Sequence, residues 1–206
     1  MTGEHPLAAY APDNVWFRRS PRGIHGAPHT TRVLVWANRL AGMIAVPTAL
    51  RLEELRWAAA VHDVGRINDD VDPGHGARSA DWLRDHLTAA RPAAAGVDLE
   101  FVAELCRWHE TRDDAIKSFT LELMILKDAD GLDRCRIHGL DPRRLRLTRS
   151  HDLVQDAERL ERATDDYGRV GAADVLAADG RLFPRQRTGP ASQSPERPIL
   201  MANGIL

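Results

Sequence analysis

Four segments that lie far apart in the sequence each carry a histidine or an aspartate in register with the apolar residues of a predicted helix. These residues are His29, His62, His109 and Asp130. A helix that buries its apolar face also buries such side chains, and each one costs roughly 2–7 kcal/mol if it has no partner. A divalent cation shared by imidazoles and carboxylates removes that cost. The pattern therefore predicts helices that converge on a common ion, and Asp63, next to His62, is expected to reach that ion or a neighbouring one.

The apolar spacing predicts an all-α protein, a bundle of about six or more helices, because no stretch alternates in the manner of a strand. The predicted helices cover residues 30–45, 51–64, 98–109 and 152–165, with two more that begin near residue 75 and carry residues 119–130. Asp98 is the expected N-cap of the helix at 98–109. We predict an irregular segment at 1–23, a helical domain at 24–170 and a loosely ordered tail at 171–206, rich in Pro, Gly, Ser, Gln and Arg from Gly180 onward.

Composition narrows the partners that such a domain can have. The chain has 206 residues and a net charge of −2, so neither nucleic acid nor an anionic membrane is an expected partner. The longest apolar run, Leu40–Val46, is far too short to cross a bilayer, and the first residues lack the features of a signal peptide. The two cysteines form no CxxC pattern, which favours a reducing, cytoplasmic setting. Association with further copies of the chain is left open.

Three short motifs resemble the H…HD…D signature of the HD-domain superfamily of metal-dependent phosphohydrolases. They are "HTTRV" at 29–33, "HDVGR" at 62–66 and "DADGLD" at 128–133, and the resemblance covers roughly residues 24–135. It implies an all-helical HD fold in which the core metal ligands are His29, His62, Asp63 and Asp130. Asp130 is preferred over Asp128 because the last aspartate of the family lies in an Ala-Asp-x-Leu context.

Two more histidines extend the resemblance. "HGARSA" begins at His75, and "WHETRDD", which contains His109, is similar to a weakened form of the HD-GYP motif "HHExxDG", although GYP itself is absent. In two-metal relatives, histidines in this interval complete a second site, which Asp63 would bridge here. In single-metal relatives they contact phosphate instead. One or two divalent ions are therefore expected, and the candidates are Mn, Fe, Co, Ni, Zn and Mg.

The resemblance implies a hydrolase that cleaves a phosphoester of a nucleotide or another small phosphorylated metabolite with a metal-activated water. Asp63 and Arg66 are the expected catalytic residues. Arg66 follows the HD pair where many relatives have lysine, and it is an expected phosphate contact together with Arg32 and Arg78. His25 is either a loop residue or a further member of the site.

Two other functions fit the same residues. The order H…HD…H…H…D also matches a diiron oxygenase of the HD fold. A non-catalytic HD protein that senses a nucleotide is the third alternative.

Overall fold

The computed structural model describes residues 4–44, 50–166 and 168–184. All secondary structure in these ranges is helical, which confirms the predicted all-α class. The α-helices are α1 (Ala27–Met43), α2 (Leu52–Val61), α3 (His75–Ala90), α4 (Leu99–Trp108), α5 (Leu121–Asp133), α6 (Thr148–Asp152), α7 (Val154–Arg162) and α8 (Ala172–Leu182). Short 3-10 helices are η1 (Ala8–Tyr10), η2 (Asn14–Trp16), η3 (Pro92–Gly96), η4 (Asp113–Ala115), η5 (Arg134–Ile137) and η6 (Pro142–Arg144).

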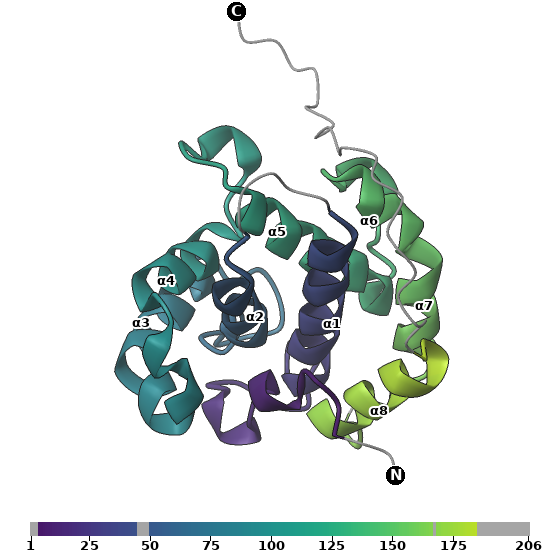
Figure 1. The fold of residues 1–206 in the computed structure, drawn as a ribbon, viewed down its shortest axis with the longest axis horizontal. Coiled ribbons are helices and arrows are strands. Elements are labelled where there is room, and N and C mark those ends of the chain that lie inside the picture. The colour runs from purple at the N-terminus through teal and green to yellow at the C-terminus, as the bar shows by residue number, and fades with distance from the viewer. Residues whose placement is uncertain (1–3, 45–49, 167, 185–206) are drawn as a thin grey trace, which may run out of the picture.

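Helix α1 is the central element of the bundle. It packs against α2, α5 and α8, while α3 and α4 pack against each other on the far side of α2 (Figure 1). The consecutive residues 33–37 of α1 are each at most 1% exposed, so this helix is covered on every side. The N-terminus of α1 is therefore held in the interior, and a polar side chain placed there has to find its partners inside the protein.

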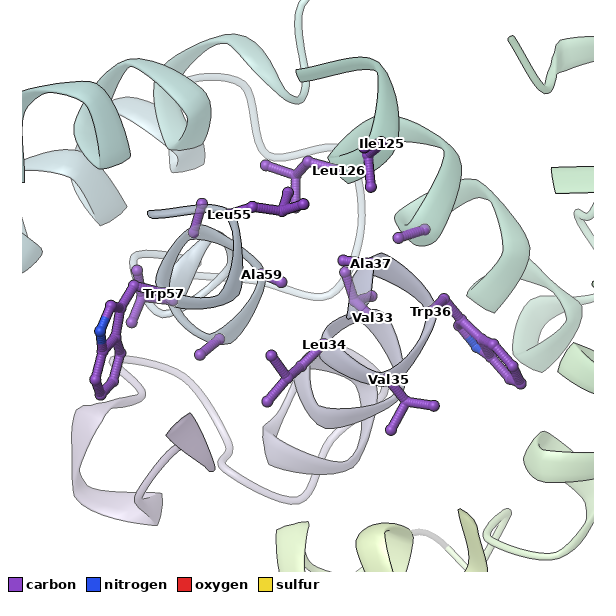
Figure 2. Close-up of a cluster of buried hydrophobic side chains, with 14 of the residues drawn as sticks. Val33, Leu34, Val35, Trp36, Ala37, Leu55, Trp57, Ala59, Ile125 and Leu126 are labelled. Atoms are coloured by element: carbon purple, nitrogen blue, oxygen red, sulfur yellow. The ribbon is translucent and has the colours of Figure 1, made fainter. Parts of the chain in front are cut away.

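The core joins α1, α2 and α5. Leu55 and Ala59 of α2, Leu126 of α5 and Val33 of α1 are all fully buried in one hydrophobic cluster (Figure 2). Trp36 and Trp57 project from opposite outer sides of the α1–α2 pair. These contacts fix the relative positions of the three helices that carry or directly precede the HD-like motifs.

Local capping explains where several helices begin. The Asp98 side chain accepts a hydrogen bond from the Phe101 backbone N–H at 3.1 Å, which confirms the predicted cap of α4. Thr120 caps α5 in the same way through the Leu123 N–H at 3.2 Å. Helix α5 thus begins at Leu121, and Phe119, which was expected inside this helix, lies just before it.

The structure differs from the sequence-based prediction in the segment 171–206, which was expected to be loosely ordered. Residues 172–182 form α8, and Val175 and Leu176 of this helix are buried in the core. Asp179 of α8 binds Arg39 of α1 at 2.6 Å and His5 at 3.0 Å. The rest of the predicted tail, residues 185–206, and the last residue of the helix predicted at 30–45 lie outside the described residues.

In the part of the chain that the structure describes, no helix has the length and apolar character needed to cross a membrane.

Candidate metal centre

The predicted ligands lie at helix ends that meet in the interior. His29 is in the first turn of α1, His75 is the first residue of α3, and Asp130 is in α5. His62 and His109 directly follow α2 and α4. All of these except Asp130, whose side chain is 29% exposed, are buried, as is Asp63. Five separate helices carry or adjoin these six side chains. The side chains nevertheless come together, as the predicted helical register requires.

The orientation of four histidines follows from what their Nδ1 atoms contact. Nδ1 of His62, His75 and His109 lies 2.9, 2.7 and 2.6 Å from the backbone oxygens of Ala59, Asp72 and Cys106. Nδ1 of His29 lies 2.7 Å from Oδ2 of Asp133. Carbonyl and carboxylate oxygens only accept hydrogen bonds, so each Nδ1 carries a proton, and a ring in its neutral form then keeps its lone pair on Nε2.

These Nε2 atoms face one another in pairs. The Nε2 atoms of His29 and His62 are 3.2 Å apart, and those of His75 and His109 are 3.0 Å apart. Two ligand atoms bound at 2.0–2.1 Å to one ion, at octahedral or tetrahedral angles, are about 2.8–3.4 Å from each other. The spacing of these lone pairs is therefore that of neighbouring ligands on a cation.

The Asp63 carboxylate lies between the two histidine pairs. Its Oδ1 is 3.1 Å from Nε2 of His75 and 3.5 Å from Nε2 of His109. Its Oδ2 is 3.4 Å from Nε2 of His29 and 3.9 Å from Nε2 of His62. Among the described residues no hydrogen-bond donor reaches the buried Oδ1. A buried carboxylate oxygen that has no hydrogen-bond donor destabilises the folded protein, and a bound cation would compensate its negative charge.

The residues present fit one or two divalent ions. We call His29, His62 and Asp130 the first group, and His75 and His109 the second group, with Asp63 between them. Asp130 Oδ1 lies 3.4 Å from Nε2 of His29, and the ligand atoms of the first group lie within 4.8 Å of one another. The donors are imidazole nitrogens and carboxylate oxygens, a set that suits Mn, Fe, Co, Ni and Zn.

The protonation of the metal-free site also suits metal binding by the first group. Burial lowers the pKa of His62 to about 3, so its ring is neutral at physiological pH. Burial works against the anionic form of Asp63, but the surrounding imidazoles, beginning with His62, outweigh it and hold the pKa of Asp63 well below its usual range. Burial also disfavours the charged form of His75, yet the negative charge of the neighbouring Asp63 carboxylate outweighs burial and raises the pKa of His75.

Three aspartates of the motif "DADGLD" have different partners. Asp128 is fully buried and accepts hydrogen bonds from the Leu147 backbone N–H at 2.8 Å and the Ser150 hydroxyl at 2.7 Å, so it anchors the segment before α6. Asp130 faces the histidines of the first group. Asp133 is fully buried and binds both Nδ1 of His29 and the Arg32 guanidinium. One helix thus supplies a structural anchor, a candidate ligand and the carboxylate that orients His29.

The arginines expected to contact substrate have different surroundings. Arg32 is fully buried, and its guanidinium binds Asp133 and the Thr164 hydroxyl. Arg78 binds the Gly65 carbonyl at 2.9 Å and the Asp72 carboxylate, so it ties the loop after the HD pair to α3. These contacts are those of positioning residues and give no support to the prediction that Arg32 and Arg78 contact substrate.

Arg66 lies beside the second group. Its Nη1 is 3.3 Å from Nδ1 of His75, and its Nη2 donates to the Asp70 carbonyl at 2.8 Å. Its buried Nε has no hydrogen-bond partner among the described residues. A guanidinium with an unused donor next to the candidate centre is suited to an anionic ligand.

Several supporting residues could not be identified from the sequence. Glu110 accepts hydrogen bonds from the backbone N–H groups of Gly74 and Gly76 at 3.2 and 2.9 Å and so holds the start of α3, where His75 lies. Lys127 donates to the backbone oxygen of His109 at 3.0 Å. Gly65 lets the HD segment approach α3, because a Cβ there would lie 2.5 Å from the Ser79 nitrogen. All of these contacts join residues that lie far apart in the sequence, and the sequence alone does not display them.

The second His-Asp dipeptide of the chain, His151-Asp152, is exposed at the end of α6, whereas it was expected to begin a helix. It takes no part in the cluster.

Comparison with protein families identifies the fold. The model of the HD domain family matches residues 26–135, which include both groups and Asp63. The chain belongs to the HD domain family. Its members are generally metal-dependent phosphohydrolases. This confirms the resemblance drawn from the three motifs. No curated protein and no solved structure matches this HD domain protein.

Proposed function

We propose that this HD domain protein is a metal-dependent phosphohydrolase that cleaves a phosphoester of a nucleotide or another small phosphorylated metabolite. The observation that carries the proposal is the convergence of four Nε2 lone pairs on Asp63, whose Oδ1 has no hydrogen-bond donor among the described residues. The family supplies the reaction class. The substrate class rests on the same resemblance and on the arginine beside the second group.

In this proposal the first group and Asp63 hold one ion, and the second group and Asp63 hold another. A divalent ion bound here lowers the pKa of a bound water toward ~7 and polarises the phosphoryl oxygen. Asp133 keeps the proton on Nδ1 of His29, so that Nε2 is free to bind. Arg66 contacts the phosphate, because its Nε has no partner among the described residues and its positive charge complements the substrate.

The experiment is a substrate screen on the full chain after metal loading. The protein is loaded separately with Mn²⁺, Fe²⁺, Co²⁺, Ni²⁺, Zn²⁺ and Mg²⁺ and tested against nucleotides, cyclic nucleotides and generic phosphoesters. Asp63→Ala is the matched control for contaminating phosphatases. Release of phosphate by the wild-type protein and not by this variant is the expected result. A folded, metal-loaded protein that hydrolyses none of these compounds would contradict the proposal.

The second group favours one alternative, a diiron oxygenase of the HD fold. All six residues of the order H…HD…H…H…D lie together, and the 3.0 Å between the Nε2 atoms of His75 and His109 suits a second ion. Two irons per chain and a mixed-valent EPR signal in the protein as isolated would favour oxygenation. Activity with redox-inert Mg²⁺ or Zn²⁺ would favour hydrolysis.

A further inference from the structure

His25 lies in the turn before α1 and differs from the other histidines of the cluster. Its ring packs edge-on against the ring of His29, with 5.6 Å between centroids, and its side chain is 15% exposed. The rings of the first and second groups present Nε2 to the centre, but His25 presents Nδ1, which lies 3.0 Å from Oδ2 of Asp63. Imidazole Nδ1 can also bind a metal, and the ligand atoms of His25, His29 and Asp63 lie within 4.8 Å of one another, so the partners of Nδ1 decide between a ligand and a positioning role.

The backbone around His25 holds the ring in this position. The Ala27 N–H donates to the Pro21 carbonyl at 2.7 Å, and a Cβ on Gly26 would lie 2.3 Å from that same oxygen, so only glycine fits this turn. Arg136 of η5 donates to the Ile24 carbonyl at 2.7 Å and to the Asp133 backbone oxygen at 3.0 Å. The turn is thus joined to the end of the helix that carries Asp130.

The contacts of the His25 Nδ1 atom decide which hydrogen bond it makes. Nη2 of Arg136 is a donor 3.1 Å from this nitrogen, and it can bond to Nδ1 only if Nδ1 has a lone pair. Oδ2 of Asp63 is an acceptor at 3.0 Å, and it can bond to Nδ1 only if Nδ1 carries a proton. Arg136 already has two backbone acceptors, but a lone pair facing a buried carboxylate would leave that anion without a donor. The charge-assisted bond to Asp63 is the stronger of the two. The proton therefore lies on Nδ1 and points at Asp63.

This hydrogen bond is distinctive among the contacts of Asp63. Among the hydrogen bonds of the described residues, this is the one made to the Asp63 carboxylate, and its acceptor is Oδ2. The other side chains close to that carboxylate are the candidate ligands and Arg66, whose Nη1 is 3.9 Å from Oδ1. A donor on Oδ2 fixes the rotation of the carboxylate and leaves Oδ1 directed at the second group.

We propose that His25 is a positioning residue of the metal centre, which donates its Nδ1 proton to Oδ2 of Asp63 and so holds the carboxylate between the two groups. The inference rests on the proposed metal centre and adds to it a residue outside the ligand set. Residues that orient a ligand in this way typically contribute 10–100-fold to metal affinity.

The test compares His25→Ala, His25→Asn and His25→Gln. The side-chain amide nitrogen of asparagine takes the place of Nδ1, while that of glutamine takes the place of Nε2. Co²⁺ affinity is measured by competition with a chelator, and the visible absorption spectrum of the bound Co²⁺ reports its ligand environment. His86→Ala, which changes an exposed histidine of α3, is the matched control. Circular dichroism confirms that each variant is folded.

We expect His25→Ala to weaken Co²⁺ binding by about 10–100-fold. His25→Asn should restore the affinity and the wild-type spectrum, and His25→Gln should restore neither. The inference is overturned if His25→Ala binds Co²⁺ as the wild type does, if glutamine rescues as well as asparagine, or if asparagine fails to rescue. Absence of Co²⁺ binding by the wild-type protein would instead overturn the proposed function and this inference together.

Discussion

The two groups that share Asp63 are built in different ways. His29 and His62 of the first group are at most 1% exposed, His29 in α1 and His62 directly after α2, and these two helices pack against each other while Asp133 orients His29. His75 and His109 of the second group are both 7% exposed, at the start of α3 and the end of α4. Backbone carbonyls are the nearest acceptors of the Nδ1 atoms of these two rings, and Oε2 of Glu110 lies 3.1 Å from Nδ1 of His75.

The hydrophobic core therefore fixes the position of the first group, whereas a loop and a helix cap fix the position of the second group. The first group moves only if α1, α2 and α5 move, which would break the hydrophobic core. The second group depends on the loop at 66–74 and on the capping of α3 by Glu110. We therefore expect the first group to bind its ion more tightly and the second to lose its ion first.

The largest loss of bound metal is expected for Asp63→Ala, because Asp63 serves both groups. This variant should bind no ion in metal analysis, lose phosphohydrolase activity, and keep most of its helical circular dichroism. Metal retained at the wild-type level by the folded variant would show that the two groups do not share this carboxylate.

A loss confined to one ion is expected for His109→Ala. If two ions bind, the metal content should fall from two to one per chain, because the first group is left complete. His62→Ala is the matched change in the first group, and it should leave the weaker ion or none. If His109 contacts phosphate instead, His109→Ala should raise KM and leave the metal content unchanged.

Asp133→Ala tests the anchoring that is specific to the first group. It removes the carboxylate that orients His29 and leaves the buried Arg32 without its ion pair, a change that typically costs about 3–5 kcal/mol of stability. Affinity for the first ion should also fall by about 10–100-fold. Urea unfolding of the metal-free protein measures the first effect and chelator competition the second. Asp130→Ala is the control, since it should reduce metal binding with little loss of stability.

The smallest effect is expected from acidification of the metal-free protein. Burial disfavours the Asp133 carboxylate, but Arg32 and then His29 outweigh burial and hold the pKa of Asp133 well below its usual value of 3.8. Its contribution to stability is complete above that value and is lost as the pH falls below it. Asp133→Asn should therefore flatten the acid side of the stability profile. Asp72→Asn, near the second group, should flatten it less. A larger effect of Asp72→Asn would reverse the comparison.

The candidate ligand set was accessible from the sequence because helical register is a local property. Once His29, His62 and Asp130 are assigned to the apolar faces of helices, burial of those faces brings them together. The same reasoning placed Arg32 near the site but assigned it a substrate contact. Its pairing with Asp133 joins residues separated by 101 positions, and a single sequence carries no signal of such a contact.

The parts that sequence reasoning missed, or left open as it did His25, depend on irregular backbone or weak patterns. His25 contacts Asp63 through a turn, where no periodicity indicates the direction of a side chain. Helix α8 has a short apolar stripe and a high alanine content, so composition obscured it. One local signal was present, since Asp174 accepts a hydrogen bond from the Gly171 N–H at 2.9 Å, three residues earlier, as acidic residues near a helix start often do.

The arrangement of aspartates on α5 limits how this helix can change. Asp128 secures it to the segment before α6, and Asp133 secures it to α1, on either side of Asp130. Deletion of one residue between Asp128 and Asp133 would rotate one end relative to the other by about 100°, the angle between successive residues of an α-helix. At least one of the three carboxylates would then lose its partner. A change in the length of this stretch would therefore separate the folding of the helix from the assembly of the centre.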